Sequence, residues 1–282
     1  MIKPFLKDEA FLADVRKNVS RDGDFHLWWL GQSGFLLHYL GFFVLIDPYL
    51  SDSLSKKYED SDKPHVRMTE RVIDPTKLDF ISIVTSSHNH TDHLDGETLI
   101  PLLAKNQQIQ LIIPEANREL VSKRTHCKAE FPIGLKQGET TTIDPFTFHA
   151  IPAAHNELDK NEKGECKYLG YVIQFGPWTV YHSGDTLWYD GMEAWLLPFS
   201  IDLAILPING NKPERRVAGN LDGREAAKLG RAIGARMVIP CHYDMFTFNT
   251  ADPAEFAYCC EKMGQSYSLQ RPGQIWSNKS LP

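Results

Sequence analysis

Three histidines and two aspartates lie within ten residues of this chain, in the segment SSHNHTDHLD at residues 86–95. The apolar segment FISIVT at residues 80–85 comes directly before it and predicts a buried strand. The candidate metal ligands form the pattern H-x-H-x-D-H: His88, His90, Asp92 and His93. In an extended loop the first two point the same way and can bind one cation, while a tight turn directs the last two toward a second cation. Imidazole and carboxylate suit borderline divalent cations such as Zn²⁺, Fe²⁺ or Mn²⁺.

Two cations this close together suit the hydrolysis of a small molecule. Such a pair can activate water at neutral pH, polarise the attacked oxygen and stabilise the leaving oxygen. Asp92 is the candidate for a catalytic role, because a carboxylate oxygen beside the second cation can relay a proton. No nucleophilic side chain is required, and the sequence contains no G-x-S-x-G elbow, Walker loop or dinucleotide-binding G-x-G-x-x-G motif.

Three later residues extend the pattern: His155 in IPAAHN, Asp185 in YHSGDT and His242 in VIPCHYDMF. With H-x-H-x-D-H, and with WWLGQSGF and VLIDPYL near the start, they make the chain resemble the metallo-β-lactamase superfamily. The resemblance covers nearly the whole chain in order. It implies an α/β fold, a four-layer αβ/βα sandwich with a metal site on one edge. The chain contains no low-complexity linker, so we expect residues 1–282 to form a single domain.

The resemblance also implies two divalent metal ions, Zn²⁺ or Mn²⁺ with Fe²⁺ as an alternative. The ligands implied for the first ion are His88, His90 and His155. The ligands implied for the second ion are Asp92, His93 and His242, with Asp185 bridging the two ions.

Within the superfamily, the motifs WWLG, YHSGDT and VIPCHYDMF are most similar to the branch that holds the ascorbate-6-phosphate lactonase. This similarity implies a small anionic ester or lactone as substrate, phosphorylated compounds included. A phosphodiesterase is the alternative, because a phospholipase D of a related branch has a similar HNH-x-DHLD motif. Two other classes stay open: a diiron oxidoreductase, although such proteins carry a carboxylate where this chain has His90, and a metal-binding protein without catalysis.

Further residues are candidates for supporting roles. Asp47 ends an apolar segment before Pro48, and we expect it to orient the ligand loop and not to bind metal. Arg215 and Arg216 lie in a loop at residues 209–220 and can bind a phosphate or carboxylate, because guanidinium matches those oxygens with two hydrogen bonds. An ordinary solvated loop is the alternative. The charged segment at residues 51–78 is expected to border the site.

Composition limits the partners and the compartment. The formal charge of −6 disfavours nucleic acid as a partner. Five cysteines without a C-x-x-C motif, and a start without an apolar signal region, predict a cytoplasmic protein with reduced thiols. Glycines interrupt the apolar stretch at residues 27–46, which predicts a buried β-hairpin and no stable membrane insertion. The sequence leaves a homo-oligomer open.

The elements that position these residues follow from short apolar runs that alternate with helical ones. Strands are expected near residues 25–30, 34–39 and 42–46, and an amphipathic helix before them. Strands occur in both halves of the chain with helices between them, which predicts two sheets packed face to face with helices outside. Many strands end in a polar residue, so we expect their loops to converge on one cleft.

Overall fold

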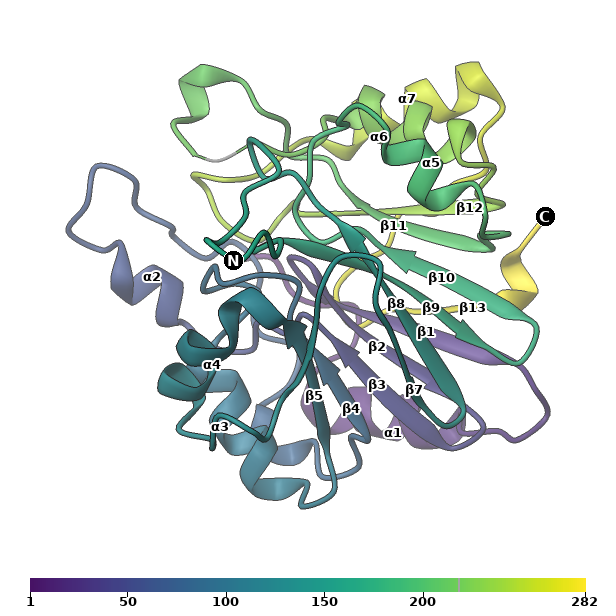
Figure 1. Ribbon diagram of the computed structural model, residues 1–282. Coiled ribbons are helices and arrows are strands. Elements are labelled where there is room, and N and C mark those ends of the chain that lie inside the picture. Colours follow the sequence, from purple (N-terminus) through teal and green to yellow (C-terminus); the bar gives the residue numbers. More distant parts are fainter. Residues whose placement is uncertain (218) are drawn as a thin grey trace.

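Two mixed β-sheets pack face to face in the computed structural model, which describes residues 1–217 and 219–282, without the side chain of Arg215 (Figure 1). Within the described residues, the first sheet has the strand order β13-β1-β2-β3-β4-β5-β6. Its strands, in chain order, are β1 Phe25–Gly31, β2 Gly34–Tyr39, β3 Phe42–Ile46, β4 Ile83–Thr85, β5 Gln110–Pro114, β6 Ile133–Leu135 and β13 Ile275–Ser277.

The second sheet has the order β12-β11-β10-β9-β8-β7 within the same described residues. Its strands, in chain order, are β7 Thr140–Ile143, β8 Phe146–Pro152, β9 Leu169–Phe175, β10 Trp178–His182, β11 Leu203–Pro207 and β12 Met237–Cys241. The pairs from β7 to β10 are antiparallel, and β10, β11 and β12 are parallel.

Helices cover the outer faces of both sheets (Figure 1). Those on the side of the first sheet are α1 Asp8–Lys17, α3 Gly96–Lys105 and α4 Arg118–Thr125. Those on the side of the second sheet are α5 Met192–Leu196, α6 Gly223–Ala232 and α7 Pro253–Met263. The short helix α2, Ser53–Lys57, projects beside the sandwich within the charged segment (Figure 1). The expected αβ/βα sandwich is therefore confirmed.

Alternation along the buried strands explains how one sequence fills two cores. Leu27 and Trp29 of β1 belong to the core between the sheets, whereas Trp28 and Leu30 pack against the helices outside. Side chains of a strand point alternately to its two faces, so a strand covered on both sides is apolar throughout. The apolar stretch at residues 27–46 is therefore sheet, and no helix among the described residues has the length and apolar character to cross a membrane.

One expected strand is shorter than predicted, and one strand was not predicted. The strand expected at residues 80–85 comprises only Ile83–Thr85, the strand β4. Before it, the Ile81 N–H donates to the side chain of Asn106 instead of to a neighbouring strand. The short strand β6 was not expected, since its three residues lack a recognisable period.

Strand direction brings the polar strand ends together. β3, β4 and β5 are parallel in the first sheet, as β10, β11 and β12 are in the second. Parallel neighbours end at the same edge of a sheet, where loops form ligand sites. Asp47, the loop at residues 86–95, Asp185 and His242 all follow such ends.

Candidate metal centre

The seven expected ligands lie at the end of the sandwich on four loops. The loop after β4 makes the predicted tight turn, in which His93 N and Leu94 N donate to His90 O at 3.1 and 2.8 Å. Asp95 caps the following helix α3 at Glu97 N, so the turn is fixed on both sides. His155 follows β8, Asp185 follows β10 and His242 follows β12. All of the ligands are buried except His90, which is partly exposed.

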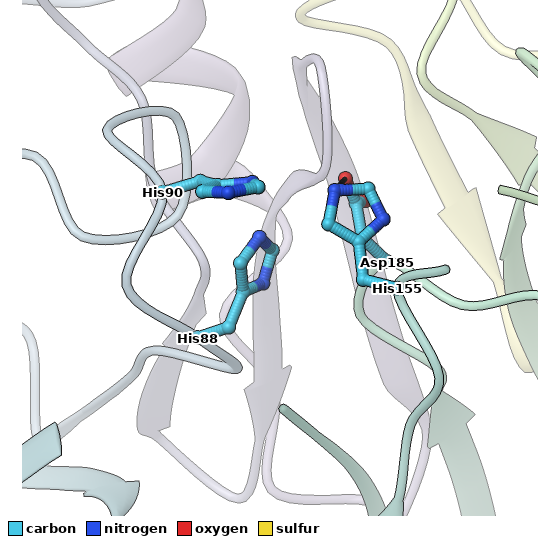
Figure 2. Close-up of side chains that lie close together, drawn as sticks. All are labelled: His88, His90, His155 and Asp185. Atoms are coloured by element: carbon cyan, nitrogen blue, oxygen red, sulfur yellow. Dashed lines mark ion pairs between the residues drawn. The ribbon is translucent and has the colours of Figure 1, made fainter. Parts of the chain in front are cut away.

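The first group joins His88, His90, His155 and Asp185, whose candidate ligand atoms all lie within 4.8 Å of one another. Figure 2 shows the three rings and the carboxylate gathered around one point. His88 Nε2 is buried and has no hydrogen-bond partner among the described residues. Buried polar atoms are rarely left unpaired, and a cation would satisfy this one. The residues of the group therefore fit a divalent cation.

The second group joins Asp92, His93 and His242 in the same way. His93 Nε2 and His242 Nε2 lie 3.3 Å apart, and each is 3.7 Å from Asp92 Oδ2. Asp185 Oδ1 lies 3.3 Å from the first of these nitrogens and 2.9 Å from the second. Tetrahedral zinc bonds of about 2.1 Å place ligand atoms about 3.4 Å apart. The four donor atoms therefore have the spacing that a cation requires.

Asp185 lies between the two groups. Its Oδ1 faces His93 and His242, while its Oδ2 lies 3.7 Å from His155 Nε2. Burial raises the pKa of this carboxyl, but His242 and His93 outweigh burial and hold the pKa well below its usual value. An ionised carboxylate with one oxygen toward each group is suited to bridge two cations.

The histidines of the two groups differ in charge preference. Burial lowers the pKa of His88 and His155, and burial together with His155 lowers that of His90 to about 4, so these rings are neutral and can act as ligands. Burial also disfavours a charge on His93, but Asp185 and Asp92 outweigh it and raise its pKa well above the usual value. The carboxylates of the second group thus favour a positive charge between them.

Asp47 supports the ligand loop from beneath. Its carboxylate accepts hydrogen bonds from Ser87 N at 3.0 Å, from Thr85 Oγ1 at 3.1 Å and from the Ser87 hydroxyl. It also accepts from His93 Nδ1 at 2.7 Å, which leaves Nε2 of that ring directed at the second group. Asp47 therefore occupies the orienting position that was expected, although its carboxylate lies near the ligand atoms of His88 and His93 as well.

The first group has its own supports. His155 Nδ1 donates to Gly219 O at 2.8 Å, and His88 Nδ1 lies 3.0 Å from Ser87 Oγ. The ring of Tyr168 packs beside His88, His90 and His155, with centroids 5.1, 5.9 and 5.6 Å away. Nothing in the sequence pattern indicated Tyr168, because its contacts with these three histidines depend on how β9 packs against the ligand loop.

Gln32 is another residue that the sequence pattern did not indicate. It lies in the turn between β1 and β2, and its Nε2 donates to Asp92 Oδ2 at 2.8 Å. The only signal was a polar amide between apolar segments. His182 and Cys241 are buried and contact the hydroxyl of Ser33, at 3.1 and 3.8 Å.

A cavity of about 450 Å³ opens onto both groups. The residues that line it are Leu54, Lys57, Tyr58, Lys63, His65, His90, Thr91, Asp92, His155, Asn156, Asp185, Arg216, Val217 and Asn249. The charged segment at residues 51–78 thus borders the site, as expected. Arg216 lines the cavity, and its guanidinium binds Asp62 at 2.6 and 2.8 Å. The side chain of Arg215 lies outside the described residues.

Comparisons with known proteins agree with this geometry. Residues 43–243 match the family model described as "Beta-lactamase superfamily domain", over more than half of the chain. The chain belongs to the beta-lactamase superfamily. This member of the superfamily is 27% identical over 256 residues to a UPF0173 metal-dependent hydrolase of Caldivirga maquilingensis, covering 89% of this chain and 96% of that one. It is 29% identical to another from Alkaliphilus metalliredigens, covering 81% and 89% of the two chains.

A solved structure shows the same fold. Igni18, a metallo hydrolase from Ignicoccus hospitalis, superposes with a TM-score of 0.65 at 23% identity and covers 90% of this chain and 98% of that chain. The expected class, a metal-dependent hydrolase with the metallo-β-lactamase fold, agrees with these relatives. The finer resemblance to the lactonase branch stays a prediction.

Proposed function

We propose that this protein is a hydrolase that binds two divalent cations, Zn²⁺ or Mn²⁺, and cleaves a small anionic ester or lactone. The observation that carries the proposal is the unpaired Nε2 atom of His88 in a buried group of neutral histidines that share Asp185 with a second group. Divalent cations at such a site act as Lewis acids and lower the pKa of water. The other parts of the reaction fall to side chains of the chain itself.

Asp92 is the proposed proton relay. Burial raises the pKa of its carboxyl, but His93 and His242 outweigh burial and lower the pKa below its usual value. Asp92 is therefore a carboxylate at neutral pH, and it lines the cavity that a substrate would enter. A carboxylate in this position can accept a proton when water attacks and return it to the leaving oxygen.

Positively charged side chains on the rim of the cavity favour an anionic substrate. Lys57 lines the cavity and forms no ion pair within the described part of the chain; its Nζ lies 3.4 Å from Thr91 Oγ1. Lys63 and Arg216 lie on the same rim, where Lys63 Nζ donates to Arg216 O at 2.5 Å. We propose that Lys57 and Arg216, with Arg215, bind the carboxylate or phosphate of the substrate.

The size of the cavity supports a small molecule. Its 450 Å³ falls at the lower end of ligand pockets, which span about 300–1,000 Å³. Tyr58 and His65 both line the cavity, and their ring centroids lie 4.6 Å apart. A compact ester or lactone with one anionic group matches these dimensions and charges.

A substrate panel tests the proposal. Protein purified without added metal is assayed with a phosphorylated lactone, a neutral ester and a phosphodiester, before and after chelation and after Zn²⁺ or Mn²⁺ is restored. We expect metal-dependent hydrolysis that is fastest with the anionic lactone, and Lys57→Ala to raise KM for that substrate but not for the neutral ester. Preference for the phosphodiester would replace the substrate class, and no metal-dependent turnover of any compound would contradict hydrolysis.

A further inference from the structure

Gln32 joins the two sheets beneath the second ligand group. It is fully buried in the turn between β1 and β2 and has a left-handed backbone conformation, with φ of 52°. Its carbonyl oxygen accepts from His242 N at 3.0 Å, which ties the turn to the segment that follows β12. The preceding Gly31 has a φ of 97°, a conformation that other residues rarely adopt, and a Cβ atom there would also crowd the end of the Met245 side chain. The turn therefore has a fixed position relative to His242.

The side chain of Gln32 contacts one ligand from each sheet. Its Nε2 lies 2.8 Å from Asp92 Oδ2, and the same atom lies against the imidazole ring of His242, 3.0 Å from Nδ1 and 3.4 Å from Nε2. Its Oε1 is buried and has no hydrogen-bond partner within the described residues. A single carboxamide, with one donor group and one unused acceptor, thus lies between two residues of the second ligand group.

The chemistry of Asp92 matches a carboxamide donor. A ligating carboxylate is itself oriented by a hydrogen-bond donor. The NH₂ group of Gln32 supplies that donor for Asp92, and the main-chain carbonyl of the same residue accepts from His242 N.

We infer that Gln32 is the positioning residue of the second cation. Its carboxamide donates to the carboxylate of Asp92, and its main-chain carbonyl accepts from His242 N, so one residue fixes a ligand from each sheet. The inference rests on the proposed function only in taking the second group as a cation site, and it requires no particular substrate. The first group has separate supports, because Gly219 O holds His155 and Ser87 holds His88. Gln32 should therefore affect the second cation alone.

Calorimetric titration of chelator-stripped protein with Zn²⁺ tests this role. Gln32→Met keeps the length of the side chain and removes its hydrogen bonds. We expect the equivalent that binds at the second ligand group to bind about 10–100-fold more weakly and the other to change little. Gln174→Met is the matched control, because Gln174 Oε1 also pairs with an imidazole, His149 Nε2 at 2.9 Å, but on strands β9 and β8 away from the ligands. That control should bind both equivalents like the wild type.

A second variant covers the case in which Gln32→Met fails to fold. Gln32→Asn suits the left-handed backbone at this position and shortens the side chain, so its amide no longer reaches Asp92 and the same equivalent should bind more weakly. Unchanged binding of both equivalents by either folded variant would overturn the inference and leave the proposed function standing. Equal weakening of both equivalents would also overturn it. A wild type that binds only one equivalent would overturn it together with the two-cation part of the proposed function.

Discussion

Replacing Asp47 by asparagine tests how the ligand loop is held. One carboxylate oxygen of Asp47 accepts from Ser87 N and Thr85 Oγ1, and an amide oxygen can keep both bonds. The other oxygen accepts from His93 Nδ1 at 2.7 Å. In Asp47→Asn an NH₂ group takes that place, so a donor faces the Nδ1 proton of a His93 ring that binds a cation through Nε2.

The size of the effect follows from the bond that is lost. A hydrogen bond to a charged group contributes about 1.5–3 kcal/mol, which corresponds to about 10- to 150-fold in a binding constant. Loss of an orienting partner of a ligating histidine costs about 10–100-fold in metal affinity. We therefore expect Asp47→Asn to weaken the binding of the cation at the second ligand group by about 10–100-fold.

Competition with a chromophoric chelator of known affinity measures this change for each equivalent. Asp202→Asn is the matched control: its buried carboxylate accepts from Thr179 N at 2.9 Å and pairs with Arg236 at 2.9 Å, at the opposite end of the second sheet from the ligands. The control should keep both affinities. If folded Asp47→Asn bound the cation at the second ligand group with unchanged affinity, the orienting role of Asp47 would be refuted.

Three further predictions concern ligation, the cavity and pH. His90→Ala should lose the first cation and most activity without a change in the circular dichroism spectrum; unchanged metal content would exclude His90 as a ligand. Arg216→Ala removes an exposed ion pair with Asp62, so the free energy of unfolding should fall by at most about 1 kcal/mol while KM for an anionic substrate rises, and an unchanged KM would exclude Arg216 from binding. Because burial and His155 lower the pKa of His90 from 6.5 to about 4, the folded protein binds fewer protons than the unfolded chain between these values. In urea unfolding of metal-stripped protein, the stability of the wild type relative to His90→Ala should therefore rise with pH across that window and level off above it; a difference that stays constant with pH would contradict the lowered pKa.

Residue type and spacing were sufficient to predict much of the site. The pattern at residues 86–95 indicated a loop with two ligand pairs, and the structure brings His88 and His90 into one group and Asp92 and His93 into another. Polar residues at strand ends predicted a shared cleft, because the ends of parallel strands meet at one edge. The pairing of His155, Asp185 and His242 with that loop depended on the family resemblance, since nothing local relates residues so far apart.

The residues that escaped prediction act through contacts between distant segments. Gln32 reaches Asp92 across 60 positions of the sequence. Lys57 faces the ligands only because helix α2 lies beside the cavity. Such contacts depend on how sheets and loops pack together, which neither periodicity nor motif spacing encodes.

Metal content of the purified protein tests the central claim most directly. Elemental analysis after dialysis against Zn²⁺ or Mn²⁺ should give about two equivalents per chain in the wild type and about one in His242→Ala, because that residue belongs only to the second group. A wild type that binds no cation, or a folded His242→Ala that still binds two, would contradict the two-cation site.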